Sequence, residues 1–243
     1  MQEKHLHHAR DWEHPDVQHY ETTIAAKIPG YPLLYDIMEQ LLSAHLGGET
    51  PADLLIVGAG GGQELITLGA QHEHWRLTGI DLSTAMLELA RQRMQRTELA
   101  AEITLQQSTV DELDKNKLFD AATCMLVLHF VKETGQKQRM LEEIHSRLQE
   151  GAILVVATLS GDVRSIPGSL PLKAWKNHML AGGISGQECE WFEHSIGETS
   201  FPLPEHELLA LLASSGFSGV TRFFSSYLID GWFAVKQGKE VAK

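Results

Sequence analysis

Short apolar runs and amphipathic stretches alternate along residues 53–159. Apolar runs bounded by glycine or polar residues are typical of buried strands, whereas apolar residues spaced three and four apart are typical of helices. Strands separated by helices predict βαβ units, and hence an α/β fold with a doubly wound, mostly parallel sheet covered by helices on both faces. The expected strands are 53–58, 76–81, 101–107, one within 119–130, and 152–159. The expected helices are 62–72, 83–99 with Ser83 as N-cap, and 137–148 ended by Gly151.

The segments on either side complete a single domain. Residues 32–46 carry apolar side chains at helical spacing between Pro32 and Gly47, which predicts a helix. The regular pattern breaks after residue 160, and a helix at 205–217 and two antiparallel edge strands within 219–237 are expected to follow it. The expected parts are a mobile N-terminal tail (1–19), a helical cap (20–50), a ligand-binding core (51–160), an inserted substrate cover with one helix near 171–181 (161–203), and a C-terminal helix with edge strands (204–243). With the edge strands, the sheet has seven strands.

A glycine cluster directly follows the first strand of this series. Gly58, Gly60 and Gly62 give the spacing G-x-G-x-G, and Gln63 stands where a dinucleotide-binding fingerprint has its third glycine. The phosphate-binding P-loop is excluded because no Gly-Lys-Ser/Thr follows. Asp81 ends the second strand, nineteen residues after Gly62, where a carboxylate can accept hydrogen bonds from ribose hydroxyls. The alternative is that Asp81 only favours the N-terminus of the next helix.

The composition favours a small-molecule ligand over nucleic acid. The net charge is −12, and no cluster of Lys and Arg of the kind that neutralises phosphates is present. Apolar runs are shorter than the ~20 residues that span a membrane, and the polar N-terminus does not resemble a secretory signal. Two cysteines, Cys124 and Cys189, provide no disulfide framework, so a reducing cytoplasm is expected.

Five segments in order resemble the motifs of class I S-adenosylmethionine-dependent methyltransferases, which have a Rossmann-like fold. They are "LLIVGAGGGQE", "LTGIDLSTAMLELARQR", "ITLQQSTVDEL", "FDAATCMLVLHFV" and "LEEIHSRLQEGAILVVA". The resemblance covers about residues 20–160 closely and the C-terminal segment more loosely. Within the superfamily, "KIPGYPLLYDIMEQLL" is similar to the N-terminal segment of carboxy-S-adenosylmethionine synthase and related methyltransferases.

This resemblance implies roles for nine residues in binding S-adenosylmethionine. They are Gly58, Ala59 and Gly60 under the methionine part, Asp81 at the ribose, Leu82, Thr109 and Val110 around the adenine, Met125 beneath the sulfonium, and Tyr31 towards the carboxylate. Two positions depart from the family pattern, since Ile56 and Thr109 stand where it often has acidic residues. Both departures suggest that binding depends more on backbone contacts.

Several histidines are candidates for chemistry in the cover and after the fourth strand. His129 follows that strand and is the expected catalytic base or substrate contact, although a buried histidine satisfied by a backbone carbonyl is the plainer interpretation. His178, His194, Trp175 and Trp191 either line a substrate pocket or seal the cover onto the core.

Other residues that suggest ligands have plainer explanations. The tract of His5, His7 and His8 lacks a Cys or acidic partner, so a mobile tail is favoured over a metal site, and no metal is expected. The helically spaced Met86, Met94 and Met140 are expected to pack rather than to ligate.

These observations predict a methyltransferase that acts on a small molecule, with a homodimer left open. The alternatives are an NAD(P)-dependent oxidoreductase, against which Gln63 speaks, and a non-catalytic module that binds S-adenosylmethionine. A carboxylated cofactor would need a basic partner in the cover. The segment around His194 offers Glu188, Glu190 and Glu193 instead, which argues against it.

Overall fold

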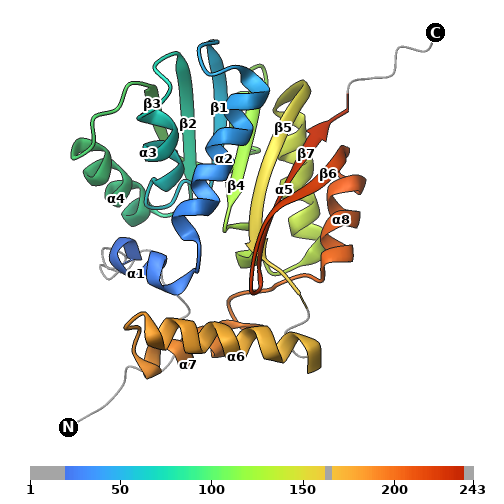
Figure 1. The fold of residues 1–243 in the computed structure, drawn as a ribbon. Coiled ribbons are helices and arrows are strands. Elements are labelled where there is room, and N and C mark those ends of the chain that lie inside the picture. Colours follow the sequence, from blue (N-terminus) through green and yellow to red (C-terminus); the bar gives the residue numbers. More distant parts are fainter. Residues whose placement is uncertain (1–19, 162–165, 238–243) are drawn as a thin grey trace.

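The computed structural model describes residues 20–161 and 166–237, and it contains one seven-stranded sheet (Figure 1). The strands are β1 (Ala52–Val57), β2 (Trp75–Asp81), β3 (Glu102–Gln107), β4 (Phe119–Met125), β5 (Leu148–Leu159), β6 (Phe217–Ser226) and β7 (Ile229–Lys236). Their order is β3-β2-β1-β4-β5-β7-β6. The chain moves outward from β1 to β3 and then returns to β4, so strand order reverses between β1 and β4.

The sheet is mixed. The four pairings among the neighbouring strands β3, β2, β1, β4 and β5 are parallel. The two pairings made by β7 are antiparallel. The expectation of a mostly parallel sheet therefore holds only for these five strands, and not for β6 and β7. The β6–β7 hairpin forms one edge, as the two apolar runs after residue 217 predicted.

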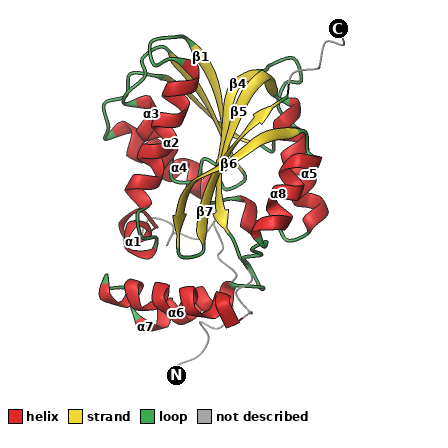
Figure 2. Ribbon diagram, turned by 45° about the vertical axis from the view of Figure 1, so that its right-hand side comes forward, coloured by secondary structure: helices red, strands yellow, loops and turns green. Residues whose placement is uncertain are grey.

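Helices cover both faces of the sheet (Figure 2). One face carries α2 (Tyr31–Leu46), α3 (Gln63–Gly69) and α4 (Thr84–Gln95), and the other carries α5 (Thr134–Ser146) and α8 (Glu205–Ser214). Alternate residues of β1 enter different cores, since Leu54 and Ile56 pack in the cluster that contains α2 and α3, and Leu55 and Val57 in the cluster that contains α5 and α8. A strand buried on both faces explains why β1 reads as a continuous apolar run.

Three helices lie at one end of the sheet. They are α1 (Tyr20–Lys27), α6 (Ile166–Ala181) and α7 (Gly186–Ser195), and Figure 1 shows α6 and α7 running below the strand ends. The sequence predicted a single helix in this cover, and α7 was missed. Ser185 and Glu188 form a capping box at its start, with each side chain bonded to the other's backbone amide.

Gly151 does not end a helix, which corrects the prediction made from its position. The helix α5 ends at Ser146, and β5 already begins at Leu148. The Phe119 amide donates to the Arg147 carbonyl at 2.8 Å, and Leu148 then pairs with Phe119 of β4. Gly151 lies inside β5 with a φ of 81°, near the point where the pairing with β4 shifts register. Strand pairing therefore takes over before the glycine is reached.

The cover leaves and re-enters the core at one place. Ser160 forms a parallel bridge with Leu203, and the Gly161 amide donates to the Leu203 carbonyl at 2.9 Å. The Ser160 amide also donates to the Leu228 carbonyl at the tip of the β6–β7 hairpin, at 2.7 Å. The two ends of the cover thus lie side by side on the strand end.

The remaining expectations about the chain are met in part. Cys124 and Cys189 are both buried and free. Met86 is buried, and Met94 and Met140 pack against the two cores. Within residues 20–161 and 166–237, no helix is long and apolar enough to cross a membrane. His5, His7 and His8, with the expected tail 1–19, lie outside the described residues.

Candidate functional site

The glycine turn follows β1 at the point where strand order reverses. Gly58, Gly60 and Gly62 have φ angles of 70°, 49° and 82°, in the left-handed region that side chains disfavour. Gly62 is the N-cap of α3. In open α/β sheets, ligands bind outside the carboxyl ends of the strands at such a reversal. The turn is therefore in the position where a ligand would contact the backbone.

Asp81 joins the glycine turn to the end of β2 through hydrogen bonds. Its Oδ2 accepts a hydrogen bond from the Gly60 amide at 2.8 Å, and its Oδ1 accepts one from the Ser83 amide at 2.8 Å. The Ala59 amide also donates to the Ile80 carbonyl at 2.8 Å. Ser83 caps α4 as predicted, because its hydroxyl accepts from the Met86 amide at 3.0 Å. Since an ionised carboxylate offers about four acceptor sites, holding the turn and receiving hydroxyls are compatible roles for one side chain.

Local contacts explain why positions 58 and 62 are glycine and why position 63 is not. A Cβ on Gly58 would lie 2.3 Å from Val127 Cγ2, and one on Gly62 would lie 3.0 Å from Ala90 Cβ of α4. Gly62 thus provides the close helix contact that a third fingerprint glycine would provide. Gln63 instead binds Arg93, whose guanidinium donates to the Gln63 side chain at 2.8 Å and to the Gly61 carbonyl at 2.6 Å. No pattern in the sequence indicates that Arg93 reaches the turn from α4.

An exposed apolar side chain lies beside Asp81. Leu82 is 67% exposed at the end of β2, and Gln107 at the end of β3 donates to its carbonyl at 3.0 Å. The Thr109 amide donates to Glu112 at 2.9 Å, and a hydrogen bond from Thr109 lowers the pKa of Asp111. Val110 is buried, and its carbonyl accepts from the Arg147 guanidinium at 3.3 Å. These residues form one rim of the strand ends, next to the turn.

A buried acid lies just behind the glycine turn. Glu64, in the first turn of α3, is 3% exposed, and its Oε1 has no hydrogen-bond partner. Burial is the main cause that raises the pKa of Glu64 to about 8, and the nearby Asp81 carboxylate adds to the rise. Sequence reasoning missed this group, although it follows the glycines directly.

The segment after β4 touches the turn on one side and a cavity on the other. Met125 is buried at the strand end, and Val127 packs against Gly58. Leu126 has a φ of 61°, an unusual conformation for a side chain with a branched body. Such strain persists only where the surroundings impose it, and it is concentrated at functional sites.

His129 is held firmly in the short helix η2 (Leu128–Phe130). Its Nδ1 accepts a hydrogen bond from the Leu159 amide at 3.2 Å and lies 3.2 Å from the Thr158 hydroxyl. Its carbonyl accepts from the Phe201 amide at 2.6 Å. The side chain is 7% exposed, so the histidine is buried as the plainer interpretation expected, but a backbone amide rather than a carbonyl satisfies Nδ1.

A buried lysine supports the short helix η2 that contains His129. Lys137 of α5 is 1% exposed, and its ammonium donates to the Leu128 carbonyl at 2.8 Å and to the Phe201 carbonyl at 2.9 Å. Burial lowers the pKa of Lys137 to about 8. Lys137 therefore joins the η2 turn to the segment that returns from the cover.

The cavity next to His129 is small and mostly apolar, with a volume of about 80 Å³. Its floor comes from the strand ends, including Leu126, Leu159 and Ile229. Its roof comes from α1, α6 and α7, and includes Trp175 and Phe192, whose rings meet at 4.5 Å. The pocket thus lies between the core and the cover.

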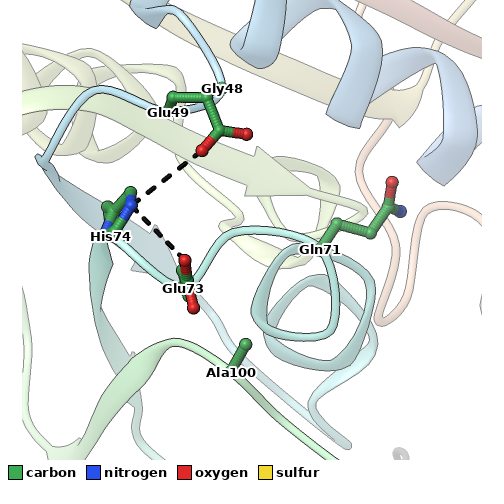
Figure 3. A pocket seen from close by; sticks show the side chains of 6 residues that line it. All are labelled: Gly48, Glu49, Gln71, Glu73, His74 and Ala100. Atoms are coloured by element: carbon green, nitrogen blue, oxygen red, sulfur yellow. Dashed lines mark ion pairs between the residues drawn. The ribbon is translucent and has the colours of Figure 1, made fainter.

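A second hollow lies where the chain enters β1, β2 and β3, at the other end of these strands from the glycine turn (Figure 3). His74 lies there between Glu73 and Glu49, with Nε2–Oε distances of 3.5 and 3.9 Å. All three side chains are solvent-exposed. In the part of the chain that the structure describes, no three His, Cys, Asp or Glu side chains are placed to hold a metal ion.

Several expected residues lie outside the small cavity. Trp175 lines it, but Trp191 is 59% exposed and is not among the lining residues. His194 is bonded to the Glu190 carbonyl within its own helix at 2.8 Å, and His178 lies 6.3 Å from the Tyr227 ring. Tyr31 is buried at the start of α2 against Tyr35, with ring centroids 4.8 Å apart.

The sequence of the core matches a known family. Residues 55–154, which contain the glycine turn, Asp81 and the β4 strand end, match the methyltransferase domain family. The core of the chain, residues 55–154, belongs to the S-adenosylmethionine-dependent methyltransferases. This membership sets aside the oxidoreductase alternative.

The relatives of this methyltransferase differ in how much of the chain they match. The carboxy-S-adenosyl-L-methionine synthase of Campylobacter lari is 22% identical over 89% of this chain and 90% of its own length. The ubiquinone biosynthesis O-methyltransferase of Alkalilimnicola ehrlichii is 31% identical over 55% of this chain, and the chain spans about half of that relative's length, 51%. The second match is thus confined to part of each protein.

Solved methyltransferase structures share the fold. The magnesium protoporphyrin IX methyltransferase of Synechocystis, solved with bound SAH, superposes with a TM-score of 0.62 over 86% of this chain and 84% of its own, at 17% identity. The N-methyltransferase NodS of Bradyrhizobium japonicum, also solved with SAH, gives a TM-score of 0.60 over 94% and 96%, at 16% identity. At such identities the likeness concerns the fold.

Proposed function

We propose that this methyltransferase binds S-adenosylmethionine across the ends of β1, β2 and β4 and transfers its methyl group to a small-molecule acceptor in the adjoining cavity. The observation that carries the proposal is the bond from the Gly60 amide to Asp81, which joins the glycine turn to a ribose-binding carboxylate. Val127 contacts the turn, while Leu126 and His129 line the cavity. One short segment therefore contacts both half-sites.

The residues present fit this cofactor. The glycine turn allows close backbone approach to its methionine part, Asp81 receives the ribose, and the exposed Leu82 provides an apolar surface for the adenine. The remaining cofactor-binding proposals are Tyr31, Ala59, Thr109, Val110 and Met125. When bound, S-adenosylmethionine supplies a methyl group activated by a sulfonium.

The protein's own contribution is alignment. Holding two reactants in line can lower a barrier by about 7–11 kcal/mol without a catalytic side chain. The strained Leu126 and the hydrogen-bonded His129 fix the segment that contacts both the glycine turn and the cavity, and the cover lies over that cavity. Absence of an obvious base therefore does not favour the non-catalytic alternative.

A carboxylated cofactor remains disfavoured, for a reason that the sequence did not reveal. The cavity does contain a cation, Lys27, but it comes from α1 rather than from the cover. Its ammonium is paired with Glu188 of α7 at 3.0 Å. A further carboxylate there would compete with an existing partner.

The test is calorimetric titration with S-adenosylmethionine, S-adenosylhomocysteine and NAD. Leu82→Asp should lower affinity for the first two at least tenfold, because a charged side chain replaces the exposed apolar surface beside Asp81. Leu118→Asp is the matched control. Leu118 is 39% exposed and comes just before β4, at the opposite end of the strands from Leu82. Binding of NAD alone, or equal affinity in both variants, would contradict the proposal. Tight binding without turnover of any metabolite would favour the non-catalytic module.

A further inference from the structure

Glu64 is a buried carboxyl group next to the glycine turn. It lies in the first turn of α3, two residues after Gly62, and is 3% exposed. In the described part of the chain its Oε1 has no hydrogen-bond partner. Buried polar atoms are nearly always hydrogen-bonded, and the exceptions call for a physical reason. An unpartnered carboxyl oxygen beside a proposed ligand site points to a donor on the ligand.

The carboxyl group of Glu64 lies among three strand ends. Besides burial, the charge of Asp81 at the end of β2 raises the pKa of Glu64, and besides burial, the charge of Glu64 raises the pKa of Cys124 in β4. Glu64 itself comes directly after the turn that follows β1. Residues 60–62 are all glycine, so this part of the turn has no side chain that could cover the carboxyl group. A cofactor across the ends of β1, β2 and β4 would therefore lie beside it.

The other side chains next to the turn are committed or uncharged. Asp81 accepts hydrogen bonds from the Gly60 and Ser83 amides, and it is the proposed partner of the ribose. Ile56, two residues before Gly58, is fully buried and carries no charge. Glu64 is thus the carboxyl group beside the turn that has an oxygen left to accept a hydrogen bond.

The surroundings keep this carboxyl group protonated. Burial raises the pKa of Glu64 to about 8, and a hydrogen bond with its own backbone and the charge of Arg93 on α4 lower it by less. Arg93 itself donates to Gln63 and to the Gly61 carbonyl. The remaining titratable groups that the elements packed against α3 bring to its face are the phenols of Tyr31 and Tyr35 on α2, Glu39 on α2, which is bonded to His72, and the exposed Glu102 at the start of β3.

The methionine part of the cofactor carries a group that suits Glu64. It has an ammonium, and hydrogen bonds between ionised partners are about twice as strong as those between neutral groups. An opposite charge at this distance also favours the ionised form of an acid. We propose that Glu64 accepts a hydrogen bond from this ammonium at Oε1, and that its carboxyl group gives up its proton to solvent when the cofactor binds. The ammonium keeps its own protons, so one proton leaves for each cofactor bound. This role rests on the proposed function.

The experiment counts that proton. S-adenosylhomocysteine, which has the same amino-acid part, is titrated calorimetrically into the full chain at pH 6.5, in buffers that differ in their enthalpy of ionisation. Because this pH lies below the pKa of Glu64 in the free protein, release of nearly one proton per ligand is expected. The affinity should accordingly rise about tenfold per pH unit between pH 6 and 7.5. Binding without proton release would overturn the proposal, since a carboxyl group that meets no ammonium keeps its proton.

Two comparisons assign the proton to Glu64 and to the ammonium. Glu64→Gln should bind without this release, whereas Glu98→Gln, at an exposed position after α4, should match the wild type. The second comparison uses 5′-methylthioadenosine, which has the adenosine but not the amino-acid part, and it should bind the wild type without releasing the proton. Equal release by both ligands, or by wild type and Glu64→Gln, would refute the assignment.

The outcomes separate this role from the function on which it rests. The wild-type proton count and the comparison of the two ligands need no variant, so they hold even if Glu64→Gln does not fold. Failure of S-adenosylhomocysteine to bind would refute the proposed function and the role of Glu64 with it. Tight binding with no proton release would refute the role of Glu64 alone.

Discussion

Replacing Glu64 with Gln should remove a loss of stability that the wild-type protein suffers as the pH rises from about 4.5 to 8. Burial raises the pKa of Glu64 from 4.5 to about 8, and its Oε1 has no partner. In this pH range the unfolded chain releases the proton while the folded chain keeps it. Since the folded state then binds more protons, its stability falls with rising pH. Gln keeps the shape of the side chain and cannot ionise.

The magnitude follows from the width of that pH range. One unit of pKa shift corresponds to about 1.36 kcal/mol, so raising the pH from 4.5 to 7 costs the wild-type protein about 3 kcal/mol relative to the variant. The difference should be small at pH 4.5, grow steadily, and level off above pH 8. A residual constant offset reflects the amide's own hydrogen bonding and does not affect the slope.

The assay is urea unfolding followed by circular dichroism at several pH values between 4.5 and 8.5. The comparison of Glu64→Gln with wild type cancels the titration of all other groups, and Glu98→Gln, at an exposed position of the sequence after α4, is the matched control. A difference that stays within about 1 kcal/mol across this range would show that Glu64 is ionised in the folded state, and the reasoning from burial would be wrong.

Three further substitutions test the framework of the site. Gly58→Ala should weaken S-adenosylhomocysteine binding at least tenfold in calorimetry. Its Cβ would lie 2.3 Å from Val127, and the φ of 70° at this position disfavours any side chain. Gly135→Ala, where a Cβ meets nothing within 4 Å, should leave the affinity unchanged. Lys137→Met should lower the melting temperature and the turnover, since two buried carbonyls lose their donor at about 1–3 kcal/mol each; unchanged melting would refute its supporting role. Glu39→Ala should destabilise the fold by about 1–3 kcal/mol in urea unfolding, because it leaves the buried His72 without its partner at 2.8 Å, and full stability would contradict this.

The parts that sequence predicted well have local signals. The buried strand β1, the Ser83 cap of α4 and the edge hairpin all follow from patterns within a few residues, and the glycine turn and Asp81 were found because strand ends gather at one edge of a sheet. The capping box of α7 was also a local signal, Ser185 three residues before Glu188, which could have revealed the missed helix.

The parts that sequence missed depend on contacts between distant segments. Arg93 reads as a surface residue of α4, and only the packing of α4 beside the turn brings it to the Gly61 carbonyl. Lys137 likewise reads as solvated, yet it lies buried between η2 and the segment at Phe201. Neither the hydrogen bonds of His129 nor the pairing of Lys27 has a pattern along the chain, because the partners Leu159 and Glu188 lie far away in sequence.

The cover's two ends meet at Ser160 and Leu203, and this has a consequence for how such an enzyme can change. A segment whose entry and exit points touch can be lengthened, shortened or exchanged while the sheet beneath it keeps every one of its strand pairings. The cofactor half-site and the acceptor half-site are therefore free to diverge at different rates. Grafting a foreign segment between these two residues is a direct route to a new substrate on an unchanged scaffold.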